Sequence, residues 1–247
     1  MLLLISFCAL YRRRAQNTLG LSVVLFLLAN AAPYGLLIAL IFSALLVFDW
    51  ARNEESPSLR AAPHLRVSAL IVLAGVACAT LQLVLMKASP GTVWKHPFTV
   101  SGISDTVINI WRAYVPIPIG FPSLSRWAWG TDFIDAIPAR QFVKVGLALM
   151  LAVISAGVLL KKPPARFLYV VGVAALLSIQ FIVNSGAMRH KAFLFLLFLA
   201  PLWVAGVSVE RESSRIPLRR LGTFFDRIRT PFVVGLLAIQ TVAGAYT

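Results

Sequence analysis

Residues 65–86 read LRVSALIVLAGVACATLQLVLM, and this apolar run decides the fold class of the chain. It is long enough for an α-helix to cross ~30 Å of bilayer hydrocarbon, which takes about 20 residues. Residues 142–160, 165–187 and 192–209 approach or reach the same length. Apolar residues make up 59% of the chain and charged residues 13%, with a mean hydropathy of +0.84. A soluble core of this size could not enclose so much apolar surface. We therefore predict an all-α, polytopic transmembrane helix bundle.

The hydropathy pattern predicts about eight membrane segments. They cover residues 2–11, 17–31, 33–50, 65–87, 141–160, 165–187, 191–209 and 231–246. Pro33 suits the first position of a helix, so the second and third segments should form a tight hairpin. The first segment is too short to cross a bilayer alone. We divide the chain into N-terminal helical hairpins (residues 1–87), an outer interfacial loop (88–140) and C-terminal transmembrane helices (141–247).

The basic residues gather in loops that fall on one side of such a bundle. These loops hold 15 of the 23 Lys and Arg residues: Arg12, Arg13, Arg14, Arg52, Arg60, Arg66, Lys161, Lys162, Arg166, Arg211, Arg215, Arg219, Arg220, Arg227 and Arg229. The positive-inside rule makes this side cytoplasmic and residues 88–140 periplasmic, in a bacterial inner membrane. The same rule accounts for the formal charge of +14, so no nucleic-acid partner is expected. Residues 219–230 are either an amphipathic helix on the membrane surface or a solvated loop.

The outer loop is rich in proline and aromatic residues and poor in charge. Alternating prolines at residues 116–122 exclude a regular helix there. Residues 103–114 and 124–137 are predicted as short interfacial helices. The acids of this face are Asp105, Asp132 and Asp135. A segment of this length is expected to be ordered against the membrane, with at least one acid bonded to a basic residue.

A compact positive cluster, Arg189, His190 and Lys191, lies between two long apolar segments on the outer side. Positive charge is disfavoured on that side, and a helix N-terminus favours an anion. We predict that this cluster binds a lipid phosphate or another anion, with Arg140 and Lys144 as helpers. Ion pairs with the acids of the outer loop, or extension of the side chains to the lipid headgroups, are the alternative explanations of the cluster.

Polar residues inside the apolar segments are few. Gln180 and Asn184 are four residues apart and share one helix face directed toward Arg189. The plain interpretation is hydrogen bonding between helices, and it applies also to Asn30, Gln82 and Gln240. Gly75 and Ala79 form a small-xxx-small pair that predicts close helix packing. Asp49 is interpreted as an interfacial anchor.

Motifs of the common enzyme classes are absent. The sequence contains no phosphate-binding loop, dinucleotide fingerprint, zinc-protease motif or nucleophile elbow. His64, His96 and His190 lack metal-ligand spacing. We therefore predict no metal and no cofactor, and no catalytic residue can be named.

Three segments together resemble a known group of proteins. They are FLLANAAPYG (residues 26–35), MRHKAFLF (188–195) and QTVAGAY (240–246). They resemble uncharacterised bacterial inner-membrane proteins that look like GT-C-type glycosyltransferases, which use polyprenyl-phosphate sugars. That resemblance implies a helical membrane fold and a polyprenyl-phosphate partner. Such enzymes carry a catalytic carboxylate in the first outer loop, whereas residues 31–33 contain no acid. We therefore expect this chain to be a later portion of such a protein.

Two functions stay open. One is the lipid-binding membrane portion of a transferase that uses a lipid-linked sugar. The other is a non-catalytic scaffolding subunit of a larger membrane complex. A transporter is a weaker third option, because the apolar segments contain neither a central acid nor a broken helix.

Overall fold

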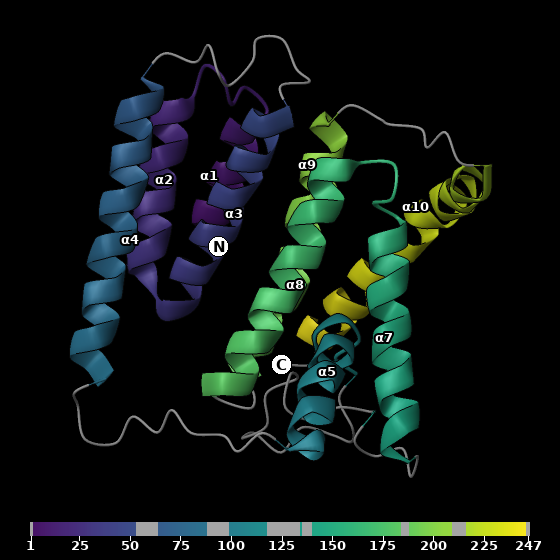
Figure 1. Cartoon of the computed structure of the whole chain (residues 1–247). Helices are drawn as coiled ribbons and strands as arrows, with labels where there is room; N and C mark the ends of the chain where they lie inside the picture. Colours follow the sequence, from purple (N-terminus) through teal and green to yellow (C-terminus); the bar gives the residue numbers. More distant parts are fainter. Residues whose placement is uncertain are drawn as a thin grey trace. The chain divides into compact units, whose positions relative to one another are not determined.

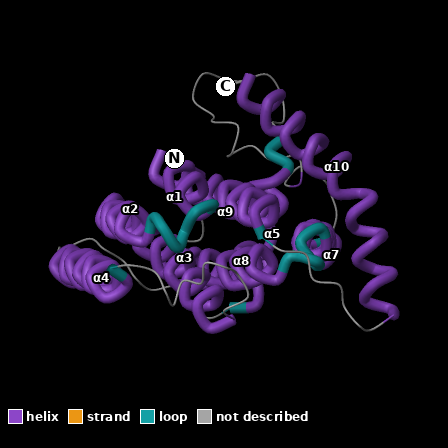
Figure 2. The backbone as a smooth tube through the Cα atoms, turned by 90° about the horizontal axis from the view of Figure 1, so that it is seen from above, coloured by secondary structure: helices purple, strands orange, loops and turns teal. Residues whose placement is uncertain are grey.

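A computed structural model describes residues 2–52, 64–87, 99–117, 134, 140–183, 188–208 and 216–245. Across these residues every regular element is an α-helix, as Figures 1 and 2 show. The helices are α1 (Leu2–Tyr11), α2 (Thr18–Ala31), α3 (Pro33–Arg52), α4 (Leu65–Lys87), α5 (Val100–Tyr114), α7 (Gln141–Gly157), α8 (Pro163–Val183), α9 (Met188–Val207) and α10 (Ile216–Ala245). The predicted all-α class is confirmed.

Four helices within the described part of the chain are long and apolar enough to cross a membrane. They are α3, most of α4 and α8, and residues 220–245 of α10. Apolar side chains of α4 stay exposed, among them Leu70 at 65% and Leu85 at 64%. Such a surface suits lipid tails, which are as apolar as leucine. By length and composition these are four candidate membrane-spanning helices, as a multi-pass membrane protein requires. The shorter apolar helices α1, α2, α7 and α9 match the other predicted segments, and their crossing stays a prediction.

Several predicted helix boundaries are confirmed and others are wrong. Ala32 is extended and separates α2 from α3, as the Pro33 hairpin requires. The helix predicted to begin at Pro231 begins at Ile216 and keeps the proline inside. Residues 219–230 are thus helical rather than a loop. The helix predicted to reach residue 160 ends at Gly157, where short-range backbone bonds form a turn over residues 158–161.

The described residues fall into two compact units. Unit 1 comprises residues 1–93, 164–175 and 200–209, and unit 2 comprises residues 94–163, 176–199 and 210–247. Helices α1 to α4 belong to unit 1. Helices α5, α7 and α10 belong to unit 2, and α8 and α9 each contribute a part to both units.

Unit 1 is held by close helix contacts in which α2 lies against α1, α3 and α4 (Figures 1 and 2). The rings of Phe7 and Phe42 stack with centroids 4.2 Å apart. A Cβ on Gly75 would lie 2.9 Å from the Cα of Phe26, so only glycine permits this approach of α4 to α2. The predicted small-residue contact at Gly75 is confirmed. Asn30 donates to the carbonyl of Gly75 and Gln82 donates to Asn30, both at 3.3 Å.

Unit 2 packs around a cluster of aromatic rings. Tyr114 is fully buried and its ring lies 5.8 Å from Phe195 and 5.4 Å from Phe198. At the other end of α7, Lys161 pairs with Asp226 at 2.5 Å. This ion pair brings the basic turn after α7 to the basic first half of α10. Within unit 2 the two segments lie at the same end, as the predicted topology requires.

Candidate functional site

Helix α5 positions the most unusual polar residues of unit 2. Thr99 caps the helix by accepting a bond from the backbone N–H of Gly102 at 3.1 Å. The helix is amphipathic, with Val100 and Asp105 exposed and Ile108, Asn109 and Tyr114 buried. The sequence predicted a helix over residues 103–114, and the structure confirms it with a start three residues earlier.

A chain of hydrogen bonds joins α5 to α8. The guanidinium of Arg112 donates to Oδ1 of Asn109 at 3.1 Å. The amide of Asn109 in turn donates to Oε1 of Gln180 at 3.3 Å. Asn109 and Gln180 are completely buried, and Arg112 is partly buried. The predicted hydrogen bonding of Gln180 between helices is confirmed. Because the bond to Gln180 fixes the amide of Asn109, the oxygen of that amide holds the guanidinium in one orientation.

The end of α5 is fixed from α10. Gln240 donates to the carbonyl of Ala113 at 2.7 Å and to that of Tyr114 at 3.3 Å. The last carbonyls of a helix have no partner within the helix, so an amide from a neighbouring helix satisfies them. The bond to Ala113 places the Gln240 amide at the residue that follows Arg112 in the sequence. It also links three helices of unit 2 around the same polar cluster.

The start of α7 lies beside the start of α5. Gln141 donates to a carboxylate oxygen of Asp105 at 2.7 Å. At least one of the three acids of the outer loop was expected to bond to a basic residue. The partner of Asp105 among the described residues is the amide of Gln141, and Asp132 and Asp135 lie outside the described residues. Arg140 occupies the N-cap position of α7 and is exposed, and Lys144 is half-buried one turn later.

The start of α9 supplies a further cation. Lys191 lies in the first turn of α9 and is 8% exposed. The side chains of Arg189 and His190, and all of Asn184, Asp132 and Asp135, lie outside the described residues. The structure thus leaves the roles predicted for them as predictions.

Helices α5, α7 and α9 of unit 2 carry more basic than acidic residues at these ends. Arg112 lies near the end of α5, Arg140 and Lys144 at the start of α7 and Lys191 at the start of α9, and the acid of α5 is Asp105. The indole N–H of Trp111 is also a buried donor with no hydrogen-bond partner among the described residues. An arrangement of donors and cations on a scaffold of buried amides is suited to holding an anion. The described residues contain no group of three His, Cys, Asp or Glu that could hold a metal.

A second buried charge cluster, in unit 1, was missed by the sequence analysis. Nε of Arg14 lies 3.1 Å from a carboxylate oxygen of Asp49, and the two side chains are 8% and 7% exposed. The hydroxyl of Tyr11 also donates to Asp49, and the guanidinium of Arg14 lies over the Tyr11 ring. Asp49 is therefore not a simple interfacial anchor. The signal in the sequence was a single acid at the end of an apolar helix, with three arginines in the preceding loop.

Comparison with known proteins adds no assignment. No protein family, no curated protein sequence and no solved structure matches this chain.

Proposed function

We propose that this protein is the lipid-binding membrane portion of a transferase that uses a lipid-linked sugar, in the inner membrane of a bacterium. Unit 2 holds the lipid phosphate near its outer end. Arg112, Lys191, Arg140 and Lys144 supply positive charge, with Arg189 and His190 next to Lys191 in sequence. A membrane lipid, polyprenyl phosphate in particular, is the proposed partner.

The observation that carries this proposal is the placement of Arg112 on a buried amide network. Ionisable residues among apolar helices are costly and usually mark a pathway or a binding site. A guanidinium offers five donors in a planar fork that suits two phosphate oxygens. Asn109 accepts from one of those donors and thereby orients the guanidinium.

The experiment measures retention of polyprenyl phosphate by the purified protein, using native mass spectrometry in detergent. Charge-assisted hydrogen bonds contribute ~1.5–3 kcal/mol each, so Arg112→Gln and Arg189→Ala should each weaken retention by about tenfold or more. Arg112→Lys should restore it only partly, because an ammonium lacks the fork. Arg227→Gln is the control, since this exposed residue lies on α10. Equal retention by Arg112→Gln, Arg189→Ala and the control would reject the site.

The second candidate is a scaffolding subunit of a membrane complex. The observation that favours it is that the polar contacts of α5, α8 and α10 all stabilise helix packing. On this alternative Arg112→Gln leaves lipid retention unchanged but lowers the melting temperature or loosens a complex with another membrane protein. Measuring retention and melting on the same sample separates the two functions.

A further inference from the structure

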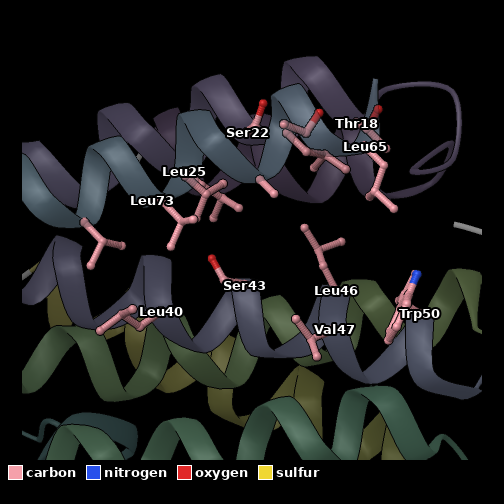
Figure 3. Close-up of a pocket in the computed structure, with 15 residues that line it drawn as sticks. Thr18, Ser22, Leu25, Leu40, Ser43, Leu46, Val47, Trp50, Leu65 and Leu73 are labelled. Carbon is pink, nitrogen blue, oxygen red and sulfur yellow. The ribbon is translucent and has the colours of Figure 1, made fainter. Parts of the chain in front are cut away.

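An elongated apolar cavity lies in unit 1, distinct from the polar cluster of unit 2. It has a volume of about 460 Å³ and lies between α3 and the pair formed by α2 and α4. Figure 3 shows Thr18, Trp50 and Leu65 at one end of it, with Leu40 and Leu73 toward the other. This volume is in the ordinary range for a small-molecule site.

The cavity follows from where the three helices are pinned together. Gly75 lets α4 touch α2, and Asn30 and Gln82 bond near the same level. At that end α2 and α3 meet in the Pro33 hairpin, where a Cβ on Gly35 would clash with the Leu28 carbonyl. Among the described residues, these glycine contacts and amide bonds lie toward the hairpin end, and the cavity separates α3 from α4 farther along. The cavity lies in this space between α3 and the pair formed by α2 and α4.

Its length matches one leaflet of a bilayer. Leu40 and Trp50 both line it and are ten positions apart on α3, which at 1.5 Å per residue is about 15 Å. Half of the ~30 Å hydrocarbon thickness is the same distance. The wall is almost entirely apolar, and the hydroxyls of Ser22 and Ser43 bond to carbonyls of their own helices at 2.8 and 2.7 Å. A hydrocarbon chain fits this part of the wall, where the two serine hydroxyls already have partners.

The end of the cavity near Trp50 and Leu65 carries a polar group and lies next to basic residues. Ser68 is 7% exposed, lines the cavity and has a hydroxyl with no hydrogen-bond partner among the described residues. Trp50 stands at the same end, as tryptophan does at a membrane interface. Exposed Arg66 follows Leu65 directly, and exposed Arg12 and Arg13 precede Thr18 in the adjoining turn. Basic pockets between membrane helices on the cytoplasmic side bind anionic headgroups.

We propose that this cavity holds one acyl chain of an anionic phospholipid of the inner leaflet. The chain lies between α3 and α4, an ester oxygen accepts from Ser68, and the phosphate lies at the arginines of the basic end. A transmembrane helix of a partner protein is the competing occupant. It fits less well, because a helix with side chains is about 10–12 Å across and would not require positive charge at the end of the cavity.

The test uses the full chain, purified from membranes and equilibrated with equal amounts of phosphatidylglycerol and phosphatidylcholine of the same acyl composition. Lipid that stays bound is counted by native mass spectrometry. We expect the wild-type protein to prefer phosphatidylglycerol about tenfold, as two or three arginines near the headgroup provide. Arg66→Gln should reduce the preference severalfold, whereas Arg227→Gln, at an exposed position of α10 in unit 2, should leave it unchanged.

A second experiment fills the cavity with a larger side chain and measures bound phosphatidylglycerol. Ala69→Phe places a ring in the cavity, and Ala74→Phe makes the same change on the opposite face of α4, where Ala74 is exposed. We expect Ala69→Phe to lose bound phosphatidylglycerol about tenfold and Ala74→Phe to keep it within twofold. Equal retention by the two variants would overturn the proposal, whatever their oligomeric state.

A measurement on the wild-type cavity covers the case in which Ala69→Phe does not fold. The fluorescence of Trp50 is obtained as the difference between wild-type and Trp50→Phe protein. Phosphatidylglycerol brominated on its acyl chains should quench it at lower lipid ratios than brominated phosphatidylcholine does. Trp203, which is 52% exposed and does not line the cavity, should respond equally to both lipids. An equal response of Trp50 to both would contradict the assignment.

Discussion

The buried ion pair of unit 1 gives the sharpest prediction about stability. Asp49→Asn removes the carboxylate that accepts from Tyr11 and Arg14. Breaking a buried pair by removing one partner costs about 3–5 kcal/mol, because it leaves the other charge buried without compensation. We expect about 3 kcal/mol, the lower end, because Arg14 keeps its contact with the Tyr11 ring and can extend toward the interface.

The assay is reversible unfolding of the purified protein in mixed micelles of mild detergent and dodecyl sulfate, followed by far-ultraviolet circular dichroism. Asp226→Asn is the matched control, since it makes the same change in the Lys161 pair, where Asp226 is 44% exposed. A pair this exposed contributes about 0–1 kcal/mol. Asp49→Asn should therefore lower the free energy of unfolding well beyond the control.

The double substitution Arg14→Met with Asp49→Leu should recover most of the lost stability, because it removes both buried charges together. An effect of Asp49→Asn no larger than that of Asp226→Asn would refute the argument that Asp49 is a buried structural partner.

Further predictions concern helix contacts and topology. Gly75→Leu should cost about 1–3 kcal/mol in unfolding free energy by forcing α4 away from α2, whereas Gly146→Leu, in open space, should be near neutral. Gln240→Leu should cost about 1 kcal/mol and speed hydrogen exchange at the end of α5, because two carbonyls lose their donor; unchanged exchange there would be inconsistent with this role. In a cysteine-free background, Arg13→Cys and Val100→Cys should be labelled by an impermeant thiol reagent from opposite sides of the membrane; labelling from one side would disprove the topology.

Much of the fold could be predicted from the sequence, because long apolar runs have few structural solutions in a bilayer. The run at residues 65–87 and the Pro33 hairpin were located to within a residue or two. The start of α10 was misplaced, because Pro231 resembles a helix start while the basic residues before it are compatible with either a helix or a loop. Local pattern does not distinguish a proline at the first position from one inside a continuous helix.

The candidate site could be predicted only in part. Gln180 and Gln240 were recognised as polar residues in apolar helices, but their partners lie far away in sequence, on α5. Arg112 was missed, because one arginine in an amphipathic segment is ordinary until Asn109 and Gln180 are seen buried against it. The pairing of Arg14 with Asp49 was missed for the same reason, since only tertiary packing brings the end of α3 to the turn after α1.

The most direct test of the proposed phosphate site compares polyprenyl phosphate with polyprenol, the same chain without its phosphate. Binding of each to the wild-type protein and to Arg112→Gln is measured by native mass spectrometry under identical detergent conditions. The wild-type protein should prefer the phosphate at least tenfold, and Arg112→Gln should lose most of that preference without weakening polyprenol binding. Equal binding of phosphate and alcohol by the wild-type protein would contradict the phosphate site.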